Sequence, residues 1–347
     1  MKTNHCHWAA PLTGALLLGA GVSASAEQDN YTYLDSTNRL TLSFRLGFNI
    51  HAKFTGIGTT AGNGYYYDGY VLTDSTDNFL GLTSYWGYQN ATQYSQLGDN
   101  NQPPNSFVFH KPSSAGLPSS ISDSDNPHPG AELTYDRQLG VKEDWHNLRY
   151  GVEAALNYMP ISMENNNPYN VGVTTDTYIF GGVPGQIPVP GHQGLFSGNP
   201  GDPVLVVPGT GVTTPGGTLL TQNHFDADLW GGRLGPYVEL PLSEKLNLRL
   251  SGGLALGLLD GSGSWQEKLS LNGNTLGTLS GSGDNFDVLW GYYASLDATW
   301  QINRRWAIDG AVQFQDLGTY SHDFGGRGVQ MDLSRSLFLE LGVSYSF

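Results

Sequence analysis

Apolar and polar residues alternate along several long stretches of the chain. In residues 40–54, 246–258 and 337–347 nearly every second residue is apolar, and the residues between are mostly small, polar or charged. Such a period of two places the two sets of side chains on opposite faces of a β-strand. A strand of about a dozen residues can cross a membrane, whereas strands of soluble proteins are usually about half as long. Each stretch is therefore predicted to cross a membrane with one face on lipid.

The same alternation predicts further strands, eight in all, so the fold class is expected to be all-β, an antiparallel transmembrane β-barrel. Short connections alternate with long ones, which places both termini on one side and the long loops on the extracellular side. Strand 40–54 is expected to pair with the last strand and close the barrel. The five further strands lie at residues 131–139, 148–158, 230–240, 286–302 and 306–314.

Two connections are much longer than the others, at about residues 56–128 and 160–224. Pro160 is predicted to end the strand before the second one, because proline lacks the N–H that a ladder needs. Both are expected to be large extracellular loops, the first with short strand pieces, and residues 261–284 form a shorter Gly- and Ser-rich loop. A hairpin hidden in either large loop would raise the strand number from eight to ten.

The N-terminus has the pattern of a secretory signal peptide. Lys2 supplies the positive charge, residues 8–22 are mainly apolar, and Ala24 and Ala26 form an A-x-A cleavage site. Residues 1–26 are therefore predicted to be removed, leaving a single barrel domain at 27–347. The only cysteine, Cys6, would leave with the signal, so no disulfide and no thiolate metal site is expected.

The net charge of the chain argues against one class of partner. The formal net charge is -15, with 16 Lys and Arg against 31 Asp and Glu. Nucleic-acid binding needs clustered cations, so nucleic acid is not an expected partner. No cofactor is predicted.

The last strand ends in a pattern that is known from one class of proteins. Glu340, Gly342, Tyr345 and Phe347 resemble the C-terminal insertion signal of bacterial outer-membrane barrels. With the signal peptide and the eight strands, the chain is similar to the small outer-membrane β-barrel superfamily of the outer membrane protein A and W type, without a periplasmic domain. The resemblance implies a location in the cell outer membrane, contact with its lipid, a monomer, and recognition of the terminal strand by the barrel-assembly machinery.

Charged residues occupy inward-facing positions of the predicted strands. An eight-stranded barrel is only wide enough for side chains to fill it, and buried charges must be paired. The expected result is a plug of ion pairs, and the alternative is a narrow ion path or gate. Similar heights on neighbouring strands predict pairs of Arg249 with Asp297 or Asp309, Arg233 with Glu153, and Arg45 with Glu340. The predicted network comprises Arg45, Glu132, Asp136, Arg149, Glu153, Arg233, Arg249, Asp297, Asp309 and Glu340.

Other candidate sites lie in the loops. Ser321, His322 and Asp323 have the residue types of a nucleophilic triad, but neighbouring residues in a strand point apart, which argues against an enzyme. Oxygen-rich segments lack the EF-hand spacing for calcium and are expected to be solvated. An aromatic group could form a recognition surface or pack on the barrel rim, and both remain open. The oxygen-rich segments are Asp99, Asn100, Asn101 and Asp123, Asp125, Asn126, and the aromatic group is Tyr65, Tyr66, Tyr67, Trp86 and Tyr88.

The function that these patterns favour is that of a non-enzymatic outer-membrane barrel with a structural or surface-recognition role and a lumen filled by ion pairs. The first alternative is a porin-like channel for small solutes or ions. The second is an outer-membrane enzyme that modifies lipids or peptides. A surface ligand cannot be named from these patterns.

Overall fold

The computed structural model describes residues 37–72, 82–98, 102–123, 127–145, 147–181, 192–194, 205–206 and 211–347. These residues belong to one compact unit, Asp35–Phe347. The predicted signal peptide with Ala24 and Ala26 lies outside them, as do Asp99, Asn100, Asn101, Asp125 and Asn126. In the part of the chain that is described, no helix has the length and apolar character needed to cross a membrane.

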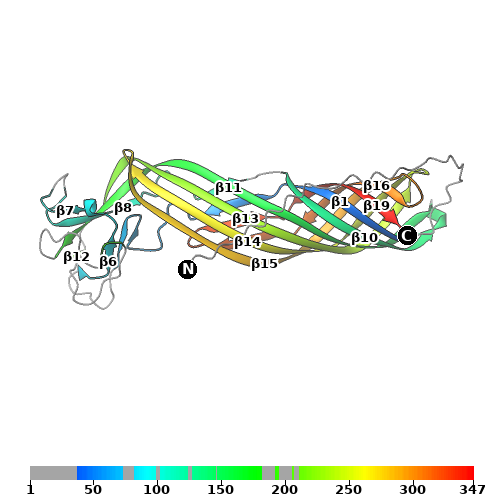
Figure 1. The fold of residues 1–347 in the computed structure, drawn as a ribbon, viewed down its shortest axis with the longest axis horizontal. Helices are drawn as coiled ribbons and strands as arrows, with labels where there is room; N and C mark the ends of the chain where they lie inside the picture. Colours follow the sequence, from blue (N-terminus) through cyan, green and yellow to red (C-terminus); the bar gives the residue numbers. More distant parts are fainter. Residues whose placement is uncertain are drawn as a thin grey trace, which may run out of the picture. The chain divides into compact units, whose positions relative to one another are not determined.

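Eight antiparallel strands form a closed ring, which confirms the predicted barrel (Figure 1). The first strand pairs with the last, and Arg45 stands opposite Glu340 in that pairing. In ring order the strands are β1 (Asn38–Phe48), β10 (His128–Lys142), β11 (Leu148–Phe180), β13 (Val212–Pro241), β14 (Leu246–Leu271), β15 (Asn274–Gln301), β16 (Trp306–Asp316) and β19 (Ser336–Ser346).

The outward face of the ring is apolar. Leu42 and Leu250 are exposed on it, and Trp300 and Trp306 lie near the end that carries the short turns. At that end the Trp306 ring lies 4.9 Å from the Tyr345 ring between centroids. Aromatic side chains at both edges of an apolar band are typical of a membrane-spanning barrel.

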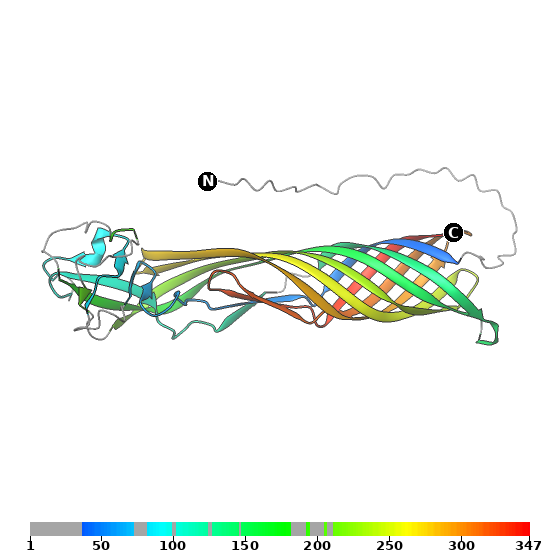
Figure 2. The same ribbon diagram turned by 90° about the horizontal axis from the view of Figure 1, so that it is seen from below.

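Four strands run far beyond the ring, as the green to orange ribbons in Figure 2 show. β11, β13, β14 and β15 have 33, 30, 26 and 28 residues, whereas about 9–11 residues cross a bilayer. The prediction that Pro160 ends its strand is therefore wrong, and much of 160–224 is strand. The predicted loop 261–284 is also wrong, because β14 and β15 continue to a turn at Asn272 and Gly273, whose φ values are 50° and 82°.

The other four ring strands are interrupted and continue as a second sheet. Its order is β17 (Thr319–Asp323), β18 (Gly328–Asp332), β2 (His51–Thr55) and β9 (Ser120–Asp123). In the chain β2 follows β1, β9 precedes β10, β17 follows β16 and β18 precedes β19. The barrel therefore opens into two facing sheets. We call these two facing sheets the extension. On the long strands it comprises the residues that lie farther from the ring than Pro160, Asp228, Asp260 and Phe286.

The break between β1 and β2 corrects the prediction of one strand over 40–54. Asn49 has a φ of 62° and reverses which face the following residues present. Ile50, Ala52 and Phe54 are consequently buried between the two sheets and do not continue the lipid face. The physical reason is that water replaces lipid beyond the ring, so apolar side chains gain by turning inward.

An apolar cluster fills the space between the sheets, and we call it the sandwich core. Phe225, Leu229 and Leu259 contribute from the long strands, and Tyr320 and Met331 contribute from the second sheet. The neighbouring residues on the long strands, such as Asp228 and Asp260, are exposed on the outward face. On β11, β13 and β14 the alternation thus continues beyond the ring, with the apolar residues now on the inward face.

The far end carries a group of short elements that we call the head. Tyr66, Trp86, Tyr88, Phe107 and Phe180 are buried together in it. Tyr67 is buried as well, in a neighbouring cluster, and only Tyr65 of the predicted aromatic group is exposed. These aromatic residues therefore pack the fold. The head consists of β3 (Tyr65–Tyr66), β4 (Gly69–Val71), β5 (Leu82–Thr83), β6 (Trp86–Tyr88), η1 (Ala91–Gln93), β7 (Tyr94–Ser95), β8 (Ser106–Pro112) and β12 (Leu205–Val206), and a single turn, η3 (Glu143–Trp145), lies near the ring.

Candidate functional site

Glu132 is the centre of the charge network inside the ring. One carboxylate oxygen accepts a hydrogen bond from Nη1 of Arg45 at 2.9 Å, and the other accepts from Nη2 of Arg233 at 2.6 Å. The Thr134 hydroxyl donates to the same carboxylate at 3.0 Å. Glu132 is almost fully buried. A buried carboxylate that bridges two guanidinium groups ties three strands of the ring together from inside.

Arg249 organises a second group of carboxylates. Its guanidinium lies 2.5 Å from Asp136, 3.3 Å from Asp297 and 3.7 Å from Glu153. The hydroxyl of Tyr293 donates to Glu153 at 2.9 Å. These residues come from β10, β11, β14 and β15, so the group extends across the lumen and is not confined to one wall.

The network continues to the turn end of the ring. Arg39 lies 3.0 Å from both Asp136 and Glu239. Arg149 reaches Glu239 at 3.4 Å. Sequence reasoning missed Arg39, although it continues the inward alternation of Thr41 and Arg45 by one more step at the start of β1.

Some of the predicted ion pairs are in close contact and others are not. Arg233 contacts Glu153, and Arg249 contacts Asp297. Arg45 lies 3.7 Å from Glu340 but makes its close contact with Glu132, which register along the strands had not indicated. Asp309 accepts a hydrogen bond from the Thr299 hydroxyl at 2.7 Å and not from Arg249.

Little space remains within the lumen. A cavity among Thr41, Asp309, Glu340 and their neighbours has a volume of ≈ 10 Å³, about that of one water-sized probe. Toward the extension, the guanidinium carbon of Arg45 lies 3.8 Å from the ring centre of Phe338. Phe338 belongs to the sandwich core. Across the described residues, the lumen is thus filled first by ion pairs and then by apolar side chains.

A buried ion pair also lies between the sheets of the extension. Nη2 of Arg327 lies 2.6 Å from Glu267, and the guanidinium stacks 4.1 Å from the Trp265 ring centre. The Tyr67 hydroxyl donates to the same carboxylate. Burial and the adjacent Glu267 raise the pKa of Tyr67 well above its usual value, so Tyr67 remains a donor at neutral pH. The cluster connects β14, the loop before β18 and the head.

The possible triad is not assembled. Ser321 and Asp323 are exposed on one face of β17, while His322 packs its ring edge against Phe324 at 4.9 Å. Asp323 instead accepts a hydrogen bond from the backbone N–H of Gly326 at 2.8 Å. Within the described ranges, no group of three or more His, Cys, Asp or Glu side chains is placed to hold a metal ion.

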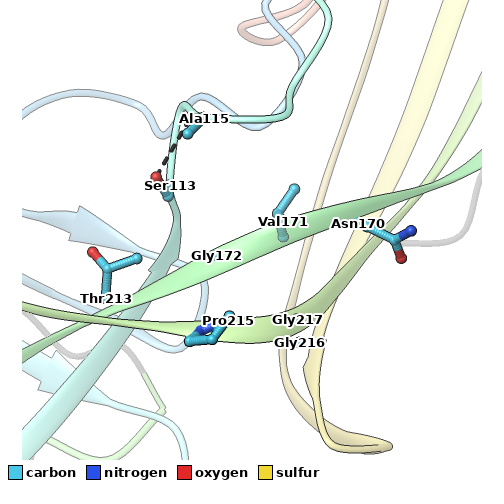
Figure 3. Close-up of a pocket in the computed structure, with 9 residues that line it drawn as sticks. All are labelled: Ser113, Ala115, Asn170, Val171, Gly172, Thr213, Pro215, Gly216 and Gly217. Atoms are coloured by element: carbon cyan, nitrogen blue, oxygen red, sulfur yellow. Dashed lines mark hydrogen bonds between the residues drawn. The ribbon is translucent and has the colours of Figure 1, made fainter.

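Described residues line two grooves on the surface of the extension. The first has a volume of ≈ 420 Å³ and lies where β11 and β13 approach the head (Figure 3). Gly172 accepts a hydrogen bond there from Ser113 N–H at 2.7 Å, and the pairing of β11 with β13 shifts register between Val171 and Val173. Its lining has no charged residue. The second groove, of ≈ 580 Å³, is polar and crosses the outward face of all four long strands.

Solved structures of outer-membrane proteins are similar to this chain at low identity and low TM-score. No protein-family model and no curated protein sequence matches it. It is similar to the solved structure of Ail, the attachment invasion locus protein of Yersinia pestis, at 8% identity over 90% of this chain and 100% of that chain, with a TM-score of 0.25.

Two further structures are similar to the same extent. The outer membrane protein OprG of Pseudomonas aeruginosa matches at 10% identity over 90% of this chain and 97% of that chain, with a TM-score of 0.30. The outer membrane protease OmpT of Escherichia coli matches at 11% identity over 90% and 97%, with a TM-score of 0.29. Similarity at this level carries no conclusion, so the barrel rests on the strand pairings of the chain itself and its role on its own residues.

Proposed function

We propose that the chain is a non-enzymatic protein of the bacterial outer membrane whose filled barrel carries the extension and head at the cell surface for recognition. The observation that supports this most is the filling of the lumen. Five arginines and six carboxylates form connected contacts from Arg39 at the turn end to Glu340, and the sandwich core follows them.

The long strands support the second half of the proposal. Beyond the ring, β14 continues from Asp260 to Leu271, which is about 40 Å of extended chain. A protein that only sealed or strengthened a membrane would not need a sandwich and a head of this length. Binding surfaces are commonly placed at the end of a rigid scaffold, and the head is placed in that way.

Conductance measurements in planar bilayers test the filled lumen. Purified full-length protein is expected to show no stepwise opening above the detergent blank. A steady ohmic opening in the wild-type protein would overturn the proposal in favour of a channel. If that opening had the same conductance in Arg45→Gln/Arg249→Gln, the ion pairs would have no part in controlling it.

Export and assembly belong to the same proposal. The mature protein is expected to begin at Glu27, to be a monomer, and to reach the outer membrane through recognition of Glu340, Gly342, Tyr345 and Phe347 by the barrel-assembly machinery. Deletion of Phe347 should reduce assembly, measured as loss of the SDS-resistant form that unfolds only on heating. Unchanged assembly of the truncated protein would contradict a role for the terminal aromatic residue.

A further inference from the structure

The polar groove on the extension has an ordered array of side chains. The strand registers place Glu164, His224, Ser264 and Ser282 opposite one another in one row across β11, β13, β14 and β15. The next row outward from the ring is Asn166, Gln222, Gln266 and Ser280. All eight residues line the groove of ≈ 580 Å³, together with Asn223, Trp265 and Gly281 from the inward positions.

Local hydrogen bonds fix part of the array. The amide of Asn166 donates to Glu164 at 2.8 Å, and the His224 ring lies 2.7 Å from the Asp226 carboxylate. Both pairs are two residues apart on one strand, so they hold their polar atoms in place on the rigid sheet. A preorganised site of this kind loses less conformational entropy when a ligand binds.

The chemistry of the lining selects a class of ligand. Side-chain amides and hydroxyls offer donors and acceptors together, which is what a molecule covered with hydroxyl groups requires. The groove contains no lysine or arginine, and Glu164 is its one carboxylate. The next row toward the ring adds Asp226 and Asp284, and the next row outward adds Lys268, so carboxylates outnumber lysines around the groove. Phosphate, sulfate and carboxylate ligands would be repelled there.

Other occupants fit the groove less well. At the rows of the groove β13 and β14 are paired on both sides, so an extended peptide could add as a further strand only at the β11 or β15 edge, where it would not cover Gln222 and Gln266. The array lacks the exposed apolar side chains that an acyl chain or an amphipathic helix would need. Its four strands span about 14 Å, which suits a chain of a few sugar units.

We propose that this groove binds an oligosaccharide made of neutral or amino sugars. The inference rests on the proposed function, because it requires that the extension be exposed at the cell surface. The groove lies three cross-strand rows, or about 20 Å, beyond the belt residue Trp230. A glycan carried on a lipid of the surrounding leaflet or on another surface could both reach that height.

An immobilised glycan panel tests the proposal. Full-length protein in detergent is applied to neutral and amino-sugar oligosaccharides and to sulfated and phosphorylated forms of the same backbones. Binding is expected to the first group and to be weaker for the second. The double variant Gln222→Ala/Gln266→Ala should bind about tenfold or more weakly, since each amide contributes hydrogen bonds to the ligand.

The matched control is Thr278→Ala, which changes an exposed residue on the same face in the next row outward. It should bind as the wild type does, and all three proteins should keep the SDS-resistant folded form. No binding to any uncharged or amino-sugar member, a preference for the sulfated or phosphorylated forms, or equal binding by the double variant would each overturn the inference.

Two additional experiments distinguish the possible sources of the glycan and separate the groove inference from the proposed function. Vesicles that carry the bound glycan on a lipid anchor, with the protein inserted, report whether the surrounding leaflet supplies it, whereas binding of only the soluble glycan assigns it to another surface. Conductance is recorded on the same preparation. If the protein shows no conductance and binds no glycan, the groove inference alone is refuted. If the protein forms a conducting pore, the proposed function is refuted instead.

Discussion

The ring and the extension share four long strands, and on β11, β13 and β14 the apolar residues change from the outward to the inward face between the two regions. Along β14, Leu250 and Leu254 point outward within the ring, and Ser262 and Gln266 point outward in the extension. Inside, the strand changes from Arg249 to apolar residues such as Leu259 and Leu269. One strand therefore carries two opposite patterns, and the change between them marks where lipid gives way to water.

The comparison shows that the surroundings decide what a barrel interior contains. Within lipid, apolar side chains are already well placed outside, so the interior can hold a network of ion pairs. Beyond the lipid, water surrounds the sheet and burial of apolar area becomes the main stabilising contribution. The flattened sandwich brings two sheets close enough to form such a core.

The largest expected effect comes from breaking the ring network at Glu132. Glu132→Ala leaves Arg45 and Arg233 without their shared partner, and breaking a buried pair costs about 3–5 kcal/mol. The measurement is the urea unfolding midpoint in lipid vesicles. Glu164→Ala is the matched control, an exposed glutamate of the extension that should change stability by less than about 0.5 kcal/mol. Equal midpoints for the two variants would contradict the importance of the ring network.

A positive charge on the outward face should distinguish the two regions. Leu254→Arg places a guanidinium in the lipid belt and is expected to cost about 2–4 kcal/mol. Ser262→Arg places it on the same face of the same strand, beside Asp226 and Asp284, and should be neutral or slightly stabilising. Refolding stability in vesicles measures both. Similar costs for the two substitutions would show that the faces are not exchanged.

A smaller effect is expected at the point where the faces exchange on the first strand. Asn49 adopts a left-handed conformation, and its amide donates to the Arg335 carbonyl at 2.8 Å. Asn49→Val should cost about 1–2 kcal/mol more than Asn49→Gly, because a β-branched residue resists this conformation and glycine accepts it. Thermal unfolding compares the two variants. Equal stabilities would remove the special role of this backbone position.

The smallest expected effect is a pH dependence in the extension. Hydrogen bonds from the Ser334 hydroxyl and N–H lower the pKa of Asp332 below its ordinary value. A lowered pKa stabilises the fold above the unfolded value of about 3.9, and this contribution is lost as the pH falls toward the folded value. The melting difference between wild type and Asp332→Asn should therefore shrink between pH 7 and pH 3. A constant difference would contradict the linkage.

The sequence predicts the ring well and the extension poorly, for one physical reason. The predicted strands relied on an apolar set that stays in phase, as from Leu246 to Leu258, and lipid imposes that phase. Beyond Leu258 the apolar residues of β14 lie at the other parity with glycines among them, and Asp, Ser, Gln and Lys fill the positions between. That change resembles the end of a strand unless an exchange of the apolar face is considered. The same consideration would have predicted that β11 continues past Pro160.

The charge network inside the ring is also predicted only in part by the sequence. Alternation alone places Arg45, Arg233 and Arg249 inside the lumen. It does not determine which carboxylate each one meets, because a long side chain crosses the lumen to strands that are not its neighbours. The contact between Arg249 of β14 and Asp136 of β10 is of this kind. Such partners depend on the curvature of the closed ring, which a strand-by-strand reading does not contain.

Cysteine accessibility along β14 tests the exchange of faces most directly. The only native cysteine, Cys6, lies in the predicted signal peptide, so single substitutions report alone in the mature protein. Leu250→Cys, Leu254→Cys, Ser262→Cys and Gln266→Cys would each be treated with a membrane-impermeant maleimide on intact cells. Labelling is expected at positions 262 and 266 and not at 250 and 254. Protection of 262 and 266, or equal labelling of all four positions, would contradict a barrel whose strands pass from lipid into a surface-exposed sandwich.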